Sequence, residues 1–199
     1  MNNASDAERL QLLQTLRLKG RGDAARIAGA WRVSEAEAAG CLEDLVAQGW
    51  VEERQGSFGL SEAGESLRGR LLDAERAQVD ADALEVLYAD FCLLDPTFKQ
   101  LVADVQLGKL ERADSARHVA PLHESLQALV ARAGALLPRL EPYAERFSEA
   151  LAALGEGDSR YLASPLVESY HGIWFEFHEE LIQASGRSRA EEDAAGADR

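Results

Sequence analysis

The segment SPLVESYHGIWFEFHEELIQ, residues 164–183, holds the residues best suited to bind a small molecule. At 3.6 residues per turn, His171 and His178 lie almost one above the other on a helix, inside an arc of apolar side chains. Apolar and aromatic walls with a few converging polar groups are typical of ligand sites. The pattern therefore predicts an effector pocket that is lined by Glu168, Tyr170, His171, Trp174, Phe175 and His178.

A packed core also explains this pattern. In that alternative a buried carboxylate, a tyrosine or a backbone carbonyl satisfies the hydrogen-bonding groups of the two imidazoles. Glu176 and Glu180 are expected on the helix face opposite the apolar arc. A metal site that joins His118, His123 and Glu168 is a further alternative, but no HExxH or CxxC-type spacing supports it. We therefore predict no metal and no cofactor.

The composition is that of a folded, helix-rich protein with an acidic surface. The 199 residues are 46% hydrophobic, and the formal net charge of −14 argues against broad attraction to nucleic acid or anionic lipid. Residues 1–75 hold nine basic and thirteen acidic residues, and the rest of the chain holds twelve and twenty-two. No apolar run approaches the ~20 residues of a membrane span, and two distant cysteines suit a reducing compartment. We expect a cytoplasmic protein without a membrane partner.

No catalytic motif is recognisable in the chain. It has no GxSxG, no P-loop and no dinucleotide-binding fingerprint, and we expect that it is not an enzyme. Four arginines of the C-terminal part have the charge to neutralise an acidic ligand. In an acidic domain, however, we expect solvated surface groups at Arg132, Arg139, Arg146 and Arg160.

The N-terminal part predicts three helices, a hairpin and a fourth helix. Ser5 with Glu8, and Ser34 with Glu37, have the spacing of capping boxes at helix starts. The runs WVEE and SFGL are expected to form two short strands around RQGS, where Gly56 suits a tight turn.

The stretch LEDLVAQGWVEERQGSFGLSEAGESL carries a family resemblance. It combines a leucine-rich helix, Gly49, an apolar-then-charged strand, a hairpin, and a Ser61-led turn where the family usually has T-x-x-G. Over about residues 5–75 the chain resembles the DNA-binding domain of MarR-type, or related PadR-like, winged helix-turn-helix regulators. The resemblance implies a recognition helix in the major groove, a wing on the DNA backbone or minor groove, and a homodimer that reads a palindrome.

The helix that the resemblance assigns to base reading is acidic. Residues 34–50 contain no Lys or Arg and four acids. Arginines around this helix and in the wing are placed to clamp phosphates, while the helix itself reads few bases. We predict contacts with double-stranded DNA from Arg26, Arg32, Ser34, Gln48, Arg54, Gln55 and Ser57. The alternative is a winged helix that no longer reads DNA and serves as a protein-interaction adaptor.

The remainder of the chain predicts helices only. The helix that Ser61 caps is expected to break near Val79-Asp80. Further helices are expected to begin at or near three prolines, Pro96, Pro121 and Pro165. Asp95 is the expected cap of the first of these helices. The polar end, residues 185–199, lacks apolar anchors and is predicted to be disordered.

The expected fold is mainly α with a small β-hairpin. It has a winged helix-turn-helix in residues 1–75 and an all-α effector-binding and dimerisation domain in residues 76–184. With the resemblance, this predicts a one-component transcriptional regulator that senses a small, largely apolar or aromatic molecule. Cys41 on the predicted recognition helix is a candidate redox switch, and a small buried hydrophobic residue is the alternative.

Overall fold

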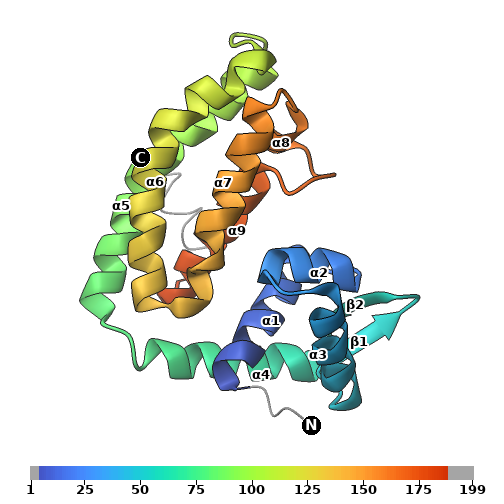
Figure 1. The fold of residues 1–199 in the computed structure, drawn as a ribbon. Coiled ribbons are helices and arrows are strands. Elements are labelled where there is room, and N and C mark those ends of the chain that lie inside the picture. The colour runs from blue at the N-terminus through green and yellow to red at the C-terminus, as the bar shows by residue number, and fades with distance from the viewer. Residues whose placement is uncertain (1–4, 188–199) are drawn as a thin grey trace. The chain divides into compact units, whose positions relative to one another are not determined.

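The computed structural model describes residues 5–187 and is mainly helical, with a two-stranded antiparallel sheet (Figure 1). The chain divides into two compact units between Gln78 and Val79. Most of the predicted disordered tail, residues 188–199, lies outside the described residues. No helix within residues 5–187 is long and apolar enough to cross a membrane.

Within residues 5–78, the first unit contains four helices and the two strands. In chain order these are α1 (Asp6–Lys19), α2 (Ala24–Trp31), α3 (Glu35–Ala47), β1 (Val51–Arg54), β2 (Ser57–Leu60) and α4 (Glu62–Arg76). Both predicted capping boxes are confirmed. The Ser5 and Ser34 hydroxyl oxygens each accept from the backbone N–H of the third helix residue, and the side chain of that residue, Glu8 or Glu37, accepts from the serine backbone N–H. The helices therefore begin where these short-range hydrogen bonds satisfy their free N–H groups.

The predicted hairpin is also confirmed, with Val51 opposite Leu60 and Arg54 opposite Ser57. Its two-residue turn places Gln55 and Gly56 at φ 55° and 76°, as tight hairpin turns with two positive φ angles require. The strands enclose part of a core that α1, α2 and α3 complete. Its buried residues are Leu12, Leu13, Leu16, Ile27, Leu42, Leu45 and Val51.

A third segment extends the edge of this hairpin. Gly22, between α1 and α2, forms an antiparallel bridge with Phe58 of β2. The Gly22 N–H donates to the Phe58 carbonyl at 3.0 Å, and the Phe58 N–H donates to the Gly22 carbonyl at 2.8 Å. The hairpin is therefore tied to the chain that precedes α2.

The start of α4 is locked against the end of α3. The Ser61 hydroxyl donates to the Gly49 carbonyl at 2.7 Å and accepts from the Gly64 N–H at 3.0 Å. The Ser61 N–H donates to the Trp50 carbonyl at 3.1 Å. A Cβ atom on Gly64 would lie only 1.9 Å from that same Trp50 oxygen. The S-x-x-G sequence is therefore a structural clasp, in which the serine caps the helix and the glycine admits a backbone carbonyl.

The second unit contains five α-helices in residues 79–187. They are α5 (Ala81–Gln106), α6 (Ser115–Leu136), α7 (Pro142–Gly155), the short α8 (Arg160–Ala163) and α9 (Tyr170–Ala184), with 3-10 turns η1 (Arg112–Asp114) and η2 (Pro138–Leu140). Helix α6 packs against α5 and α7, and α9 packs against α5, α7 and α8 (Figure 1). Phe91, Phe98, Phe147, Tyr170 and Phe177 are fully buried in this core.

The expected break between the fourth and fifth helices is confirmed, but three expected helix starts are wrong. Asp80 caps α5 through the backbone N–H groups of residues 82 and 83. Pro96 and Pro121 lie inside α5 and α6, because tertiary packing outweighs the cost of the missing N–H. Helix α9 begins at Tyr170 after the Ser169 cap, not near Pro165.

Candidate functional site

The seven residues predicted to contact DNA all lie in the first unit, on or beside α2, α3 and the hairpin. Six are exposed, and Ser57 is half-buried. Two of the polar side chains already serve the fold. The Ser34 hydroxyl is part of a capping box, and Gln48 Nε2 donates to the Asp44 carbonyl at 3.0 Å. Base contacts from these two side chains would compete with intramolecular hydrogen bonds.

The arginines of this surface differ in how they are held. Arg26 is exposed, one turn into α2. Arg54 Nη2 lies 2.7 Å from Glu52 Oε2 at the surface, with its side chain 71% exposed. Arg32 ends α2 with a left-handed backbone, φ 63°. All three arginines are exposed, and a phosphate contact from Arg54 would compete with its ion pair to Glu52.

Arg21 has a structural role that the sequence did not reveal. Its Nη2 donates to the carbonyl oxygens of Glu52, at 3.1 Å, and Ser57, at 2.6 Å. A Cβ on Gly59 would lie 2.7 Å from Arg21 Nη1, so a glycine inside the strand makes room for the guanidinium. That glycine was the only sequence signal of this contact.

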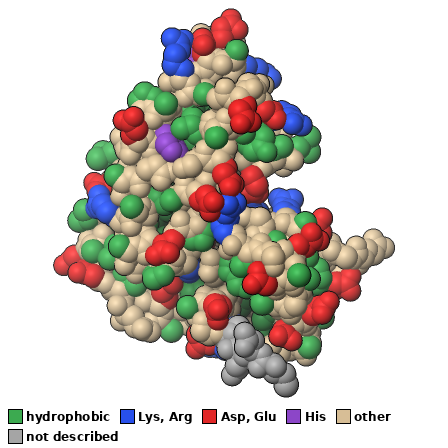
Figure 2. Space-filling model, in the orientation of Figure 1, with side chains coloured by type: hydrophobic (Ala, Val, Ile, Leu, Met, Phe, Trp, Pro, Cys, Tyr) green, Lys and Arg blue, Asp and Glu red, His purple; other side chains and the backbone are tan. Residues whose placement is uncertain are grey.

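The outer face of α3 is acidic in the folded unit. Glu35, Glu43 and Asp44 are exposed there. Figure 2 shows mainly acidic charge over the region of α3 and the hairpin. Glu37 has a pKa below its ordinary value, because the Ser34 hydroxyl and N–H hydrogen-bond its carboxylate. The capping geometry therefore accounts for Glu37, but not for the three other acids.

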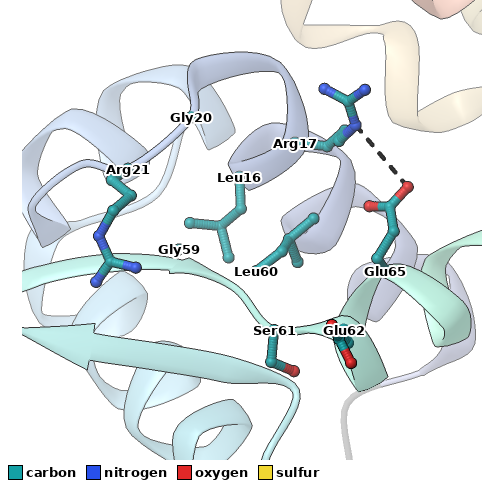
Figure 3. A pocket seen from close by; sticks show the side chains of 9 residues that line it. All are labelled: Leu16, Arg17, Gly20, Arg21, Gly59, Leu60, Ser61, Glu62 and Glu65. Carbon is teal, nitrogen blue, oxygen red and sulfur yellow. Dashed lines mark ion pairs between the residues drawn. The ribbon is translucent and has the colours of Figure 1, made fainter.

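A surface hollow of about 460 Å³ lies in the first unit, between the end of α1, strand β2 and the start of α4 (Figure 3). Leu16 and Leu60 supply apolar surface, while Arg17, Arg21 and Glu65 contribute charge at the sides. Arg17 Nε lies 3.8 Å from Glu65 Oε1. The residues predicted to bind a ligand do not line this hollow.

The predicted ligand residues take different positions in the second unit. Tyr170, Trp174 and His178 are buried, whereas Phe175 is 55% exposed. The Trp174 ring stacks on Phe98 with centroids 4.3 Å apart. The described residues thus place part of the predicted pocket wall inside the core and part on the surface. Ligand binding at these residues stays a prediction.

Asp95 is the polar partner of Trp174 and was missed as such by sequence reasoning. It is 8% exposed and accepts from Trp174 Nε1 at 2.9 Å. Lys99 Nζ lies 2.6 Å from its other carboxylate oxygen. The residue that was expected to cap a helix before Pro96 is an interior residue of α5, and it supplies the acceptor that the buried indole N–H requires.

Two buried ion pairs join α9 to η2 and α7, which corrects the expectation for these arginines. Arg139 pairs with Glu180, and both side chains are less than 10% exposed. Arg146 Nη2 lies 2.5 Å from Glu176 and 2.8 Å from Glu168. Burial lowers the pKa of Arg146, but the nearby carboxylates of Glu176 and Glu168 and the Tyr143 side chain outweigh it and hold the pKa above its ordinary value.

His123 belongs to a polar network that links α6, α7 and α9. Gln127 Nε2 donates to the Ala144 carbonyl at 2.8 Å and lies 3.2 Å from His123 Nε2. Gln127 Nε2 also donates to the Ser148 hydroxyl oxygen at 3.0 Å. An amide nitrogen only donates, so a hydrogen bond to His123 requires a neutral ring whose Nε2 accepts, and Nδ1–H then donates to the Tyr170 hydroxyl oxygen at 3.1 Å. If the ring were protonated, the N–H of His123 Nε2 would point at the N–H of Gln127 Nε2, and no hydrogen bond could form between them.

Stability of the second unit should therefore fall in mild acid. Burial lowers the pKa of His123 and of His171 below the ordinary 6.5. Because the pKa of each histidine is lower in the folded state than in the unfolded state, the neutral rings contribute their full stability above pH 6.5. That contribution is lost as the pH falls through the pKa values of the folded state. We expect a lower melting temperature at pH 5 than at pH 8, measured by circular dichroism. His123→Gln should shrink that difference, and an unchanged difference would contradict the role of His123.

The described residues offer little support for a metal or redox site. No group of three or more His, Cys, Asp or Glu within residues 5–187 is placed to hold a metal ion. Burial raises the pKa of the Cys41 thiol, and the charges of Asp44, Glu8 and Glu37 raise it further. A raised pKa disfavours the reactive thiolate, so the local electrostatics favour the alternative of a small packing residue.

Comparison of the chain with protein-family models, with curated proteins and with solved structures found no match.

Proposed function

We propose that the first unit is a winged helix that binds double-stranded DNA, in a cytoplasmic, ligand-responsive, one-component transcriptional regulator. The observation that carries the proposal is the element order, with the Gly22–Phe58 bridge set between α1 and α2. Helix, edge segment, two helices and a hairpin are the parts of a winged helix-turn-helix. In this arrangement α3 is the recognition helix and the hairpin is the wing.

Phosphate contacts supply most of the affinity in this proposal. Exposed Arg26 on α2 and Arg54 on β1 flank α3, and the loop Gln55–Gly56 forms the tip of the wing. Acids on α3 repel the DNA backbone, so non-specific binding is weak, and the affinity that the arginines supply falls as salt rises. Specificity then depends on few base contacts and on the fit of two half-sites.

The effector site belongs to the second unit in this proposal, with a homodimer that sets the spacing of the winged helices. Aromatic and ionisable side chains are concentrated on α9, among them His171 and Phe175. Since Trp174 is buried against Phe98, a ligand that reaches it must displace packed side chains. Such a ligand shifts the population between two arrangements of the unit, which is how an effector changes DNA affinity.

DNA binding is tested by fluorescence anisotropy with DNA from upstream of the protein's own gene, against unrelated DNA and across a salt series. We expect Arg26→Ala and Arg54→Ala each to weaken binding and to reduce the slope of log affinity against log salt by about 1, the effect of one lost phosphate contact. Arg160→Ala is the matched control, since Arg160 is an exposed, ion-paired arginine of the second unit. Equal affinity in all three variants would refute the proposed DNA surface.

The acidic face of α3 favours a second candidate, a protein-interaction adaptor whose winged helix is a scaffold. Exposed Glu35, Glu43 and Asp44 suit a basic protein partner better than a polyanion. Absence of DNA binding even at low salt would favour this candidate. The partner is then sought with Glu43→Lys as the variant that loses the interaction.

A further inference from the structure

The outer half of the β1–β2 hairpin buries little apolar surface of its own. In β1, Val51 is buried, and residues 52–54 after it are exposed. A hairpin of two strands is marginally stable in water unless a further element packs on it. The part of the hairpin that carries Arg54 and the turn at Gln55–Gly56 therefore needs support from outside the two strands.

Arg21, in the segment between α1 and α2, supports both strands at once. Its Nη2 donates to the Glu52 carbonyl of β1 at 3.1 Å and to the Ser57 carbonyl of β2 at 2.6 Å. In the register of the hairpin, Ser57 lies opposite Arg54. Hydrogen bonds from a charged guanidinium are stronger than those between neutral groups. The side chain therefore joins the two strands close to the turn.

The strand leaves room for this side chain at Gly59. A Cβ atom there would lie 2.7 Å from Arg21 Nη1 and 2.8 Å from Arg21 Cγ. Figure 3 shows the Arg21 side chain reaching β2 beside Gly59. The residue after Arg21 is anchored to the same strand, because Gly22 and Phe58 exchange two backbone hydrogen bonds. The guanidinium thus starts from a fixed backbone and ends on two fixed acceptors.

The backbone that Arg21 holds also places the ion-pair partner of Arg54. Glu52 accepts from Arg21 through its carbonyl, and its Oε2 lies 2.7 Å from Arg54 Nη2. A movement of the Glu52 backbone would therefore change the surroundings of the Arg54 guanidinium. Arg21 and Arg54 are connected through this one residue.

We propose that Arg21 is the positioning residue of the wing, which holds the hairpin in the arrangement that presents Arg54 to a phosphate. This inference rests on the DNA binding proposed above. A hairpin that already has its bound arrangement loses less conformational freedom when it binds, and this raises affinity. Because its Nη2 is directed at two carbonyls, Arg21 acts through the hairpin and not through a phosphate contact of its own.

Two variants break this contact in different ways. Arg21→Ala removes the hydrogen bonds together with one positive charge. Gly59→Ala retains the charge, because the atoms nearest to the new Cβ all belong to the flexible Arg21 side chain, which must move off the strand. The backbone of Gly59 is that of a strand, without a positive φ, so alanine can adopt it. Arg17→Ala is the matched control, since it removes an arginine at the end of α1 that is 52% exposed.

Amide hydrogen exchange of the full chain, followed by NMR without DNA, tests the hold on the hairpin. In Arg21→Ala and in Gly59→Ala, the amides of residues 52–58 should exchange about ten-fold faster, the effect of one lost hydrogen bond to a charged group. Amides of the α1 core and of the Arg17→Ala control should exchange as in the parent. The double variant should resemble Arg21→Ala alone, because both changes act on one contact. Exchange like the parent in both single variants would overturn the proposal.

Fluorescence anisotropy across a salt series then separates positioning from direct contact. Arg21→Ala and Gly59→Ala should each bind DNA about ten-fold more weakly, with the parent's slope of log affinity against log salt, since no phosphate contact is lost. Arg54→Ala should reduce that slope by about 1. A reduced slope in Arg21→Ala, with Gly59→Ala binding like the parent, would show a direct phosphate contact and would overturn the proposal.

The two measurements also distinguish this inference from the function on which it rests. Faster hairpin exchange in both variants of a protein that binds no DNA would refute the proposed DNA binding, and Arg21 would remain the residue that holds the hairpin. Specific DNA binding that neither Arg21→Ala nor Gly59→Ala weakens would refute the positioning role alone.

Discussion

Gly64→Ala should unfold or severely destabilise the first unit, with a loss of more than about 4 kcal/mol, a size reserved for severe local conflicts. The new Cβ would lie 1.9 Å from the Trp50 carbonyl oxygen. That oxygen is held by the Ser61 N–H at 3.1 Å, so neither backbone segment moves without breaking the clasp between α3 and α4. The change is measured by urea unfolding, followed through tryptophan fluorescence.

Gly69→Ala supplies the matched control for this prediction. Gly69 also lies in α4, and a Cβ there meets nothing within 4 Å. Alanine in a helix interior is favoured over glycine by roughly 0.5–1 kcal/mol, so this variant should be slightly more stable than the parent. If Gly64→Ala unfolded within about 1 kcal/mol of the parent, the clasp would not hold the unit together. Loss of DNA binding in Gly64→Ala, but not in Gly69→Ala, would also connect the proposed activity to the folded first unit.

Arg146→Met should cost the second unit about 3–5 kcal/mol, the range for breaking one side of a buried ion pair. Methionine retains much of the side-chain volume but leaves Glu176, whose side chain is 11% exposed, without its cation. Glu168 is 44% exposed and can turn to water, so the expected loss arises mainly from Glu176. Denaturant unfolding followed by far-UV circular dichroism measures it.

Arg160→Met is the control for the buried pair. Arg160 pairs with Asp158 at 2.6 Å, but its side chain is 66% exposed, and exposed pairs contribute ~0–1 kcal/mol. The double variant Arg146→Met, Glu176→Gln should recover part of the loss, because it removes the uncompensated charge. Equal costs for Arg146→Met and Arg160→Met would show that burial does not strengthen the α7–α9 pair.

An acidic α3 helix is compatible with the proposed DNA binding only if arginines outside the helix supply the affinity. The capping box occupies Ser34 and Glu37, while Glu43 and Asp44 stay exposed on the later turns. Exposed acids near phosphates lower affinity at every sequence and leave the flanking arginines to supply it. A salt series therefore tests the proposal better than one affinity does, because the slope against salt reports how many phosphate contacts the arginines make.

Features that depend on neighbours in the chain were predictable from the sequence. The capping boxes at Ser5 and Ser34, the turn at Gln55–Gly56 and the break before Asp80 all follow from residues within four positions of one another. Backbone N–H satisfaction and allowed φ angles decide such features locally. The mainly helical class with a small hairpin was predictable for the same reason.

Features that depend on distant partners were decided by the tertiary structure. Asp95 and Pro96 look like a helix start, yet they lie within α5, where Asp95 accepts the N–H of Trp174, 79 positions away. Glu176 and Glu180 face away from the apolar arc, yet they are buried because Arg146 and Arg139 pack over them. Helical periodicity reports which side chains share a face. It does not report whether a second element covers the opposite face, since that depends on how the helices pack together.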